Sequence, residues 1–392
     1  MLLLNQLRFS GYRSFRGQLG DDWDQASSLP LRRLTLVVGM NGTGKSQALR
    51  LLHQVLASLG EPGGPLFSSR AGGRTFANSD LANFHNMSPE ANPLRVALSW
   101  TFNRVPGELR FTIIGEPGSP TPLRVARWTL KQGEDEAQGE DTPPPWQDGR
   151  WSAVHAALVD LGRRGEALQG VRARLARDYP SFPEGGLRPS LGLDGAGAPM
   201  WLSHSPEVLR RTNRWFREHL PVRIELDNSQ GGMRLLERAG RAPINLAEAA
   251  EGIHQALPVV TMLSARALEQ APQVDLLEQP ELHLHDAMQP ALGDLLLDAV
   301  GLGVERSTHD MGQRLLVETH SEGVLLRIRR RIAEGSVQPG DIGLRYAERV
   351  NGENILREIE LDERGQLSWW PDGVFLERLQ EAKAIAVAMR RR

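Results

Sequence analysis

The feature that most constrains this chain is an eight-residue segment that matches the phosphate-binding pattern G-x-x-x-x-G-K-[ST] at every specified position, Gly39-Met40-Asn41-Gly42-Thr43-Gly44-Lys45-Ser46. A short apolar run precedes the segment and leucines at helical spacing follow it, which predicts the order strand, glycine loop, helix. Such a loop turns successive backbone N–H groups and the positive end of the helix toward one anion. We therefore expect this loop and Gln47 to bind ATP, with Lys45 on the phosphates and Ser46 on Mg²⁺.

The lysine in this loop is unusual for the chain. Of the 46 basic residues only Lys45, Lys131 and Lys383 are lysine, and the rest are arginine. A compact ammonium group fits between phosphate oxygens where a planar guanidinium does not. A lysine at this position is therefore a specific sign of a phosphate site.

Composition narrows the class of protein. With 392 residues the chain can bury a large core, and its net charge of −2 gives no general attraction to DNA or to a membrane. The chain has no cysteine, which excludes disulfides and thiolate metal sites. The N-terminus lacks a signal-peptide pattern and no run approaches the ~20 apolar residues of a membrane span. We therefore expect a cytoplasmic protein without membrane contact.

The first 149 residues are predicted to form the N-terminal lobe of a nucleotide-binding domain. Strands are expected at Leu2–Phe9, 95–102, 109–114 and 123–130, the last three as an antiparallel meander. The acidic, proline-rich segment 133–145 is predicted to be a solvated loop or linker.

Residues 150–220 are predicted to form a helical insertion. Apolar residues recur there at helical spacing, including the pair Val171 and Leu175. Such stripes usually face their own core, so we favour packing on the domain over a partner-binding arm.

The segment from Gln273 to Asp286 predicts the second half of the nucleotide site, within a C-terminal lobe of residues 221–350. An apolar strand there delivers Glu278 to its carboxyl end, where a magnesium-site acid is needed, whereas Asp275 is expected to point to the opposite face. His283, His285 and Asp286 could alternatively bind a metal, but the apolar strand and the phosphate loop explain the segment better.

A third strand, 314–318, ends in Thr319, His320 and Ser321 and leads into a helix. In a parallel sheet this position lies at the ligand crevice. His320 is therefore predicted to sense the γ-phosphate rather than to be an ordinary loop histidine.

Together these motifs resemble the ATP-binding-cassette (ABC) heads of the RecF, structural-maintenance-of-chromosomes (SMC) and overcoming-lysogenisation-defect (OLD) ATPases. The resemblance is closest to bacterial AAA-type proteins that share E-Q-P-E-L-H-L-H, E-T-H-S-E and a C-terminal W-P-D-G-F-F, found here as Glu278–His285, Glu318–Glu322 and Trp370–Phe375. The resemblance covers roughly Met1–Ser46 and Asn245–Phe375 and implies an α/β ABC-type head. With the antiparallel meander and the helical insertion predicted above, we expect a mixed-sheet head with an insertion, followed by a C-terminal extension, 351–392. The opening Gly11–Phe15 resembles the N-F-R-S-F of such heads, which places Arg13 at the nucleotide.

The resemblance also implies a signature segment, which reads here Glu248–Pro258. In such heads the signature helix of one subunit contacts the γ-phosphate held by the other. Gly252 is kept, but His254 replaces a serine. The implied assembly is an ATP-bridged homodimer with Gly252 and His254 at the partner's ATP.

A second departure concerns catalysis. Heads of this type place a catalytic glutamate after the magnesium-site acid, where this chain has Gln279. An amide orients water but is a very poor base, which predicts slow hydrolysis. Glu281 is a candidate substitute.

Two functions remain open. One is a slow ATPase switch that controls a separate effector, as the resemblance to antiphage and OLD-like ATPases implies. The other is a RecF-like clamp that holds DNA in its ATP-bound form, for which the arginines at 327, 329–331 and 390–392 are candidates, although such clusters are more often a solvated face. The chain ends about seventy residues beyond His320, too short for a typical nuclease domain. A kinase or GTPase is disfavoured because no N-K-x-D follows.

Overall fold

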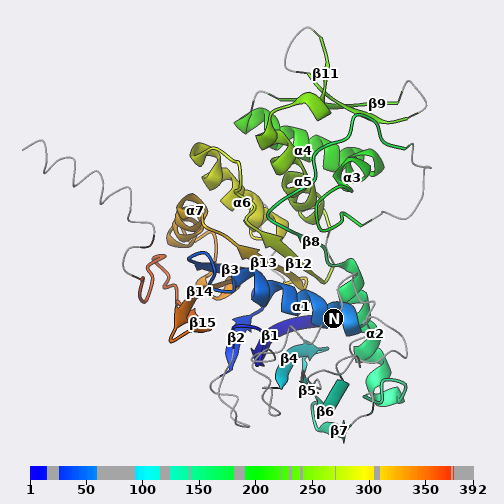
Figure 1. The fold of residues 1–392 in the computed structure, drawn as a ribbon, viewed down its shortest axis with the longest axis vertical. Helices are drawn as coiled ribbons and strands as arrows, with labels where there is room; N and C mark the ends of the chain where they lie inside the picture. The colour runs from blue at the N-terminus through cyan, green and yellow to red at the C-terminus, as the bar shows by residue number, and fades with distance from the viewer. Residues whose placement is uncertain are drawn as a thin grey trace, which may run out of the picture.

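The structure is a computed structural model. It describes residues 1–15, 26–59, 93–114, 124–140, 142, 144–180, 190–220, 222–228, 232–238, 242–269, 271–303, 310–371 and 374. The molecule contains two six-stranded sheets. In Figure 1 one of them lies at the centre and the other at one end, and helices cover the face of the central sheet that points away from the second sheet. The two sheets are separated by helices that begin at the phosphate loop and after the meander.

The central sheet carries the phosphate loop. Its strands, in sheet order, are β15 (Glu353–Glu358), β14 (Ile342–Val350), β3 (Leu34–Gly39), β13 (Gln313–Glu318), β12 (Gln273–Glu278) and β8 (Ala167–Leu168). All neighbours are parallel except β14 and β15. Because the carboxyl ends of β3, β12 and β13 meet at one edge, this edge is where a ligand crevice is expected. The strands predicted before the glycine loop, in the segment that begins at Gln273 and at 314–318 are confirmed as β3, β12 and β13.

The second sheet is the expected antiparallel meander with additions at both edges. Its order is β2 (Ser27–Pro30), β1 (Leu2–Ser10), β4 (Leu94–Phe102), β5 (Val105–Ile114), β6 (Arg124–Gln132) and β7 (Asp135–Glu140). The prediction of a solvated loop over 133–145 is wrong for β7. Gly133, at φ 62°, makes the tight turn, and Glu136 pairs with Lys131 across the hairpin, so an acidic sequence forms a stable exposed edge strand.

One hydrophobic core lies between the two sheets. It contains α1 (Lys45–Leu59) and α2 (Gly149–Arg164), and α2 is capped by the Asp148 side chain, which accepts from the Arg150 N–H. From the central sheet, Leu276 and Leu316 face this core. Because side chains alternate along a strand, Glu278 and Glu318, two residues further on, point to the same side, toward α1.

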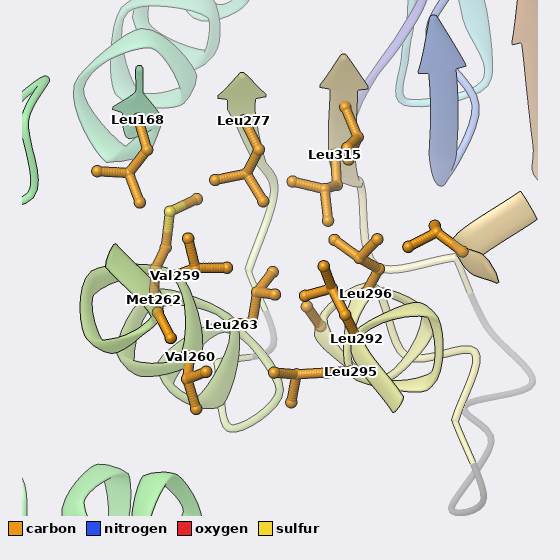
Figure 2. Close-up of a cluster of buried hydrophobic side chains, with 14 of the residues drawn as sticks. Leu168, Val259, Val260, Met262, Leu263, Leu277, Leu292, Leu295, Leu296 and Leu315 are labelled. Atoms are coloured by element: carbon orange, nitrogen blue, oxygen red, sulfur yellow. The ribbon is translucent and has the colours of Figure 1, made fainter. Parts of the chain in front are cut away.

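The other core packs helices on the opposite face of the central sheet. It contains α3 (Ala198–His204), α4 (Pro206–His219), α5 (Glu251–Arg266), α6 (Gln289–Ala299) and α7 (Glu322–Ala333). Figure 2 shows Leu263 of α5 and Leu292 and Leu296 of α6 against Leu277 and Leu315 of the strands. A leucine-to-alanine change at such a position costs about 2–5 kcal/mol.

Smaller elements complete the fold. The third sheet is β11 (Ile244–Asn245), β10 (Arg234–Glu237) and β9 (Ile224–Asp227), and short 3-10 turns span Leu246–Glu248, Asp286–Met288 and Pro339–Asp341. The expectation that Val171 and Leu175 share a helical face is wrong. Residues 169–180 are extended or turn structure, where Val171 is 78% exposed and Leu175 is buried. β8 joins the central sheet just before them, so sheet pairing takes the place of a helix.

Across the described ranges, we find no helix with the length and apolar character needed to cross a bilayer.

Candidate nucleotide-binding site

The glycine loop joins β3 to α1 and folds back on itself. Lys45 is 3% exposed, and its ammonium donates to the carbonyls of Gly39 (3.0 Å) and Met40 (2.7 Å). The Thr43 hydroxyl also donates to the Met40 carbonyl (2.8 Å). Burial lowers the pKa of Lys45, and the nearby carboxylates of Glu318 and Glu281 oppose this shift. The loop therefore holds one buried ammonium group at the start of a helix.

Glycine is required at Gly44 for two reasons. Its φ of +87° favours glycine, and a Cβ there would lie 2.5 Å from Asn354 Nδ2 and 2.8 Å from the Phe15 ring. Phe15 ends the Gly11–Phe15 turn, in which Arg13 has φ 50° and places its guanidinium over the Tyr12 ring. The opening motif thus lies against the glycine loop through Phe15, while the Arg13 guanidinium contacts Tyr12.

Two carboxylates reach α1 from neighbouring strands. Glu318, at the end of β13, accepts a hydrogen bond of 2.5 Å from the Ser46 hydroxyl. Glu278, at the end of β12, accepts from Arg50 through both carboxylate oxygens, at 2.7 and 2.9 Å. The predicted magnesium pair, Ser46 and Glu278, therefore lies at one edge, but in this structure the acid that contacts the serine is Glu318.

Gln279 begins a strained turn after β12. Its φ is 45°, its backbone N–H donates to the Glu318 carbonyl (2.8 Å), and its side-chain Nε2 donates to the Glu318 carboxylate (3.3 Å). The buried Arg172 guanidinium donates to the carbonyls of Glu278 (3.0 Å) and Gln279 (3.1 Å). Burial lowers the pKa of Arg172 to about 10, so it stays charged at neutral pH. A fixed cation thus holds the turn that carries Gln279.

Glu281 and His320 lie together beside Lys45. The Glu281 carboxylate accepts from the His320 backbone N–H at 2.6 Å, and burial raises the pKa of Glu281. Burial and then the charge of Lys45 lower the pKa of His320 to about 4, so its ring is neutral at pH 7. The structure therefore brings Glu278, Gln279, Glu281 and His320 to the edge that carries the glycine loop.

The signature residues lie at the first turn of α5. His254 is buried; its Nδ1 accepts from the Leu175 N–H (3.1 Å) and its Nε2 is 3.1 Å from the Ala249 carbonyl. Both ring nitrogens are thus used within the chain, which gives His254 a structural role in this conformation. Gly252 is partly exposed and lies close to the turn that follows β12, since a Cβ on it would lie 3.1 Å from the His283 carbonyl oxygen.

The alternative metal site finds no support in the described ranges, where no three His, Asp or Glu side chains gather in a way that could hold an ion. The His285 ring instead caps a short turn, accepting from the Ala287 N–H.

The arginines of α7 are engaged by the protein itself. Arg327 and Arg331 pair with Asp294, Arg330 pairs with Glu334, and Arg329 donates to the Gly365 carbonyl. This arrangement fits the interpretation as a solvated face. The arginines at 390–392 lie outside the described residues.

The edge offers suitable chemistry for Mg²⁺. The ion prefers oxygen ligands and is held by one or two carboxylates, a P-loop hydroxyl and nucleotide phosphates rather than by a protein cage. Ser46 and the carboxylate of Glu318 supply such oxygens around a loop built for an anion, and Glu278, paired with Arg50, ends the neighbouring strand. The donor set therefore fits the ion.

Four residues of this edge were missed by sequence analysis. Glu318 could have been found, because it ends β13 as the register partner of Glu278. Arg50 and Arg172 gave no signal among so many arginines. Gln169 follows the two-residue strand β8 and lines a small cavity with Arg50 and Glu278, but so short a strand has no readable pattern.

The described residues thus define a mixed α/β class, with a mostly parallel central sheet between helices and an antiparallel sheet. Among solved structures, the chain is similar to an SMC head bound to the C-winged helix domain of ScpA, with a TM-score of 0.55 and 14% identity, covering 92% of this chain and 98% of that chain. It is also similar to the SMC head with an extended coiled coil bound to the C-terminal domain of ScpA, derived from Pyrococcus furiosus, with a TM-score of 0.54, 12% identity and 100% coverage of both chains. No family model and no curated protein matches the sequence. The chain therefore has the fold of SMC head domains.

Proposed function

We propose that this chain is a magnesium-dependent ATPase that hydrolyses ATP slowly and acts as a nucleotide-dependent dimeric switch. The observation that carries the proposal is the meeting, at one sheet edge, of Lys45, Ser46 and the acids Glu278, Glu281 and Glu318. The fold shared with SMC heads supports the same class. Magnesium bound there would neutralise phosphate charge during transfer.

Each residue has a role that its position supports. Lys45 and the loop N–H groups bind phosphates, with Asn41 and Gln47 beside them. Gln279 orients water, and Glu281, held by the His320 N–H, is the candidate base; the neutral His320 ring is the candidate γ-phosphate sensor. Arg13 remains a proposed contact through the turn that packs on Gly44. Slow turnover follows because position 279 carries an amide.

The dimer is proposed from the position of Gly252. It lies at the exposed start of α5, whose N-terminal N–H groups have no side-chain cap and can face an anion held by a second copy. In this assembly His254 would support the helix from within rather than contact the nucleotide. Light scattering with and without a non-hydrolysable ATP analogue tests this: an unchanged mass contradicts the dimer.

For the biological role, we propose regulation of a separate effector, in an antiphage system, over a DNA clamp. The pairing of Arg327, Arg330 and Arg331 with protein acids favours this choice, because an arginine that is already paired offers less charge to phosphates. ATP-dependent co-purification of a neighbour-encoded protein would support the switch. Salt-sensitive DNA retention by the ATP-bound form, lost on changing these arginines to glutamine, would support the clamp instead.

The ATPase itself is tested with two lysine variants. Lys45→Ala removes the buried ammonium and should abolish binding and hydrolysis of ATP. Lys131→Ala is the matched control, because Lys131 is half-exposed on β6 and pairs with Glu136. Phosphate release and analogue binding should be lost only in the first variant. Hydrolysis that survives Lys45→Ala, or is absent from the wild type, would refute the proposal.

A further inference from the structure

At the carboxyl edge of the central sheet, two glutamates from neighbouring strands each pair with one side chain of α1. Glu278 and Glu318 are register partners at the ends of β12 and β13. Ser46 and Arg50 are one turn apart on α1, which lies over both strands. Ser46 bonds to Glu318, and Arg50 bonds to Glu278.

The spacing explains why each acid takes a different partner. Neighbouring strands lie about 4.8 Å apart, and residues four apart on a helix are separated by about one turn, or 5.4 Å. Two side chains of α1 therefore match two strand ends one to one. The serine of the phosphate loop meets the strand next to β3, which is β13, and not β12.

The two carboxylates also differ in how their charge is balanced. Both oxygens of Glu278 are taken by one guanidinium, so that acid is neutralised within the protein. The oxygens of Glu318 accept from a neutral hydroxyl and a neutral amide, those of Ser46 and Gln279. Among the described residues no arginine forms an ion pair with Glu318, and its charge acts on Lys45.

We propose that Glu318 is the carboxylate of the magnesium site beside Ser46, and that Glu278 is a structural acid held by Arg50. The inference rests on the proposed ATP-binding function and assigns the acid within it. A serine hydroxyl that gives an oxygen lone pair to the metal must point its O–H away from the ion, and the Glu318 carboxylate accepts the hydrogen bond from that O–H. The glutamate thereby orients the hydroxyl and places negative charge beside the cation. Removing the partner of a metal ligand typically costs about 10–100-fold in metal affinity.

The test is calorimetric titration of a non-hydrolysable ATP analogue, adenylyl-imidodiphosphate, with and without Mg²⁺. Magnesium should strengthen wild-type binding, and Glu318→Gln should reduce this strengthening by about tenfold or more. Glu278→Gln should retain it. Glu322→Gln, an exposed acid in the first turn of α7, is the matched surface control and should also retain it. Electron paramagnetic resonance of Mn²⁺ bound with the analogue gives a second readout, independent of hydrolysis.

The outcomes distinguish a failure of the proposed ATP-binding function from a failure of the assignment of Glu318. If the wild type binds no analogue with or without Mg²⁺, the proposed function fails. If the wild type binds and Glu278→Gln loses the magnesium effect as much as or more than Glu318→Gln, only the assignment of Glu318 is overturned.

A double-mutant cycle with Ser46→Ala guards against a general loss of structure. Ser46 and Glu318 act on the same ion through one hydrogen bond, so their effects on magnesium affinity should not add. The double variant should be no weaker than the worse single variant. Additive losses would show that the two residues act separately, against the proposal.

Discussion

The most informative perturbation outside the phosphate loop is Arg172→Met. Arg172 is 3% exposed, and its guanidinium donates to the carbonyls of Glu278 and Gln279. A buried carbonyl that loses its donor costs about 1–3 kcal/mol. For two carbonyls the sum is about 2–6 kcal/mol. Because the Gln279 carbonyl keeps one bond, from the Leu282 N–H at 3.1 Å, we expect the free energy of unfolding to fall by the lower part of this range, about 2–4 kcal/mol.

The same change should slow hydrolysis more than it weakens binding. In the part of the chain that the structure describes, Arg172 forms no hydrogen bond with the glycine loop, but it donates to the strained turn at Gln279. A shift of about 1 Å in a catalytic group can cost about 100-fold in rate. We therefore expect kcat to fall by about 10–100-fold while the Kd for the ATP analogue stays unchanged. Arg172→Lys retains one donor and should recover part of both losses.

Urea unfolding and phosphate release measure the two effects. Arg174→Met is the control, since Arg174 lies two residues away, with its side chain 76% exposed in a surface pair with Glu251. Such pairs contribute about 0–1 kcal/mol. If Arg172→Met unfolds and turns over like this control, Arg172 does not position the site.

Three further outcomes follow. Burial and the charge of Lys45 hold the pKa of His320 at about 4 in the folded state, whereas the unfolded value is near 6.5, so the unfolded state binds the proton first as the pH falls. The free energy of unfolding of the wild type relative to His320→Gln should therefore be full above about pH 6.5 and decline toward pH 4. A difference that does not depend on pH would contradict this. Asp275→Asn breaks a buried pair with Arg266 and should cost about 3–5 kcal/mol in urea unfolding, against about 0–1 for the exposed control Asp160→Asn. Gly44→Ala should abolish analogue binding through its clash with the Phe15 ring and the Asn354 amide. Gly42→Ala, in open space at φ +80°, should show only a backbone cost of about 1–2 kcal/mol, and equal effects would contradict the steric argument.

Strong local patterns made much of the fold predictable. Each of the strands β3, β12 and β13 is an apolar run that ends in the glycine loop or in a polar residue. The structure places these ends at one edge of the sheet. The alternation rule also predicted that Asp275 points away from Glu278; it faces α5, where it pairs with Arg266. Local chemistry was sufficient wherever a side chain's direction depends only on its own strand.

Prediction failed where the decisive partner is distant in sequence. β7 is acidic and has no apolar stripe, and it is held by basic partners on β6. β8 has two residues and exists because β12 offers it an edge. The role of Glu318 depends on sheet order, since β13 lies between β3 and β12. None of these pairings has a signature within one segment.

The contact between Gln279 and Glu318 changes what should happen when the missing glutamate is restored. The sequence alone predicts that Gln279→Glu speeds hydrolysis by supplying a base. In the structure the Gln279 amide lies 3.3 Å from the Glu318 carboxylate, so a second acid there faces a like charge in a buried place, and one of the two must take up a proton. Gln279→Glu alone should therefore bring little gain in rate.

The exchange Gln279→Glu with Glu318→Gln separates these views. The double variant keeps one acid and one amide in contact. It moves the negative charge from position 318, beside Ser46, to position 279, where the side chain orients water. If Glu318 serves the metal, the double variant should hydrolyse ATP only at raised Mg²⁺, with a rate above that of Gln279→Glu once the metal is saturating. Equal rates for the two variants at all Mg²⁺ concentrations would refute the view that Glu318 makes glutamine the compatible residue at position 279.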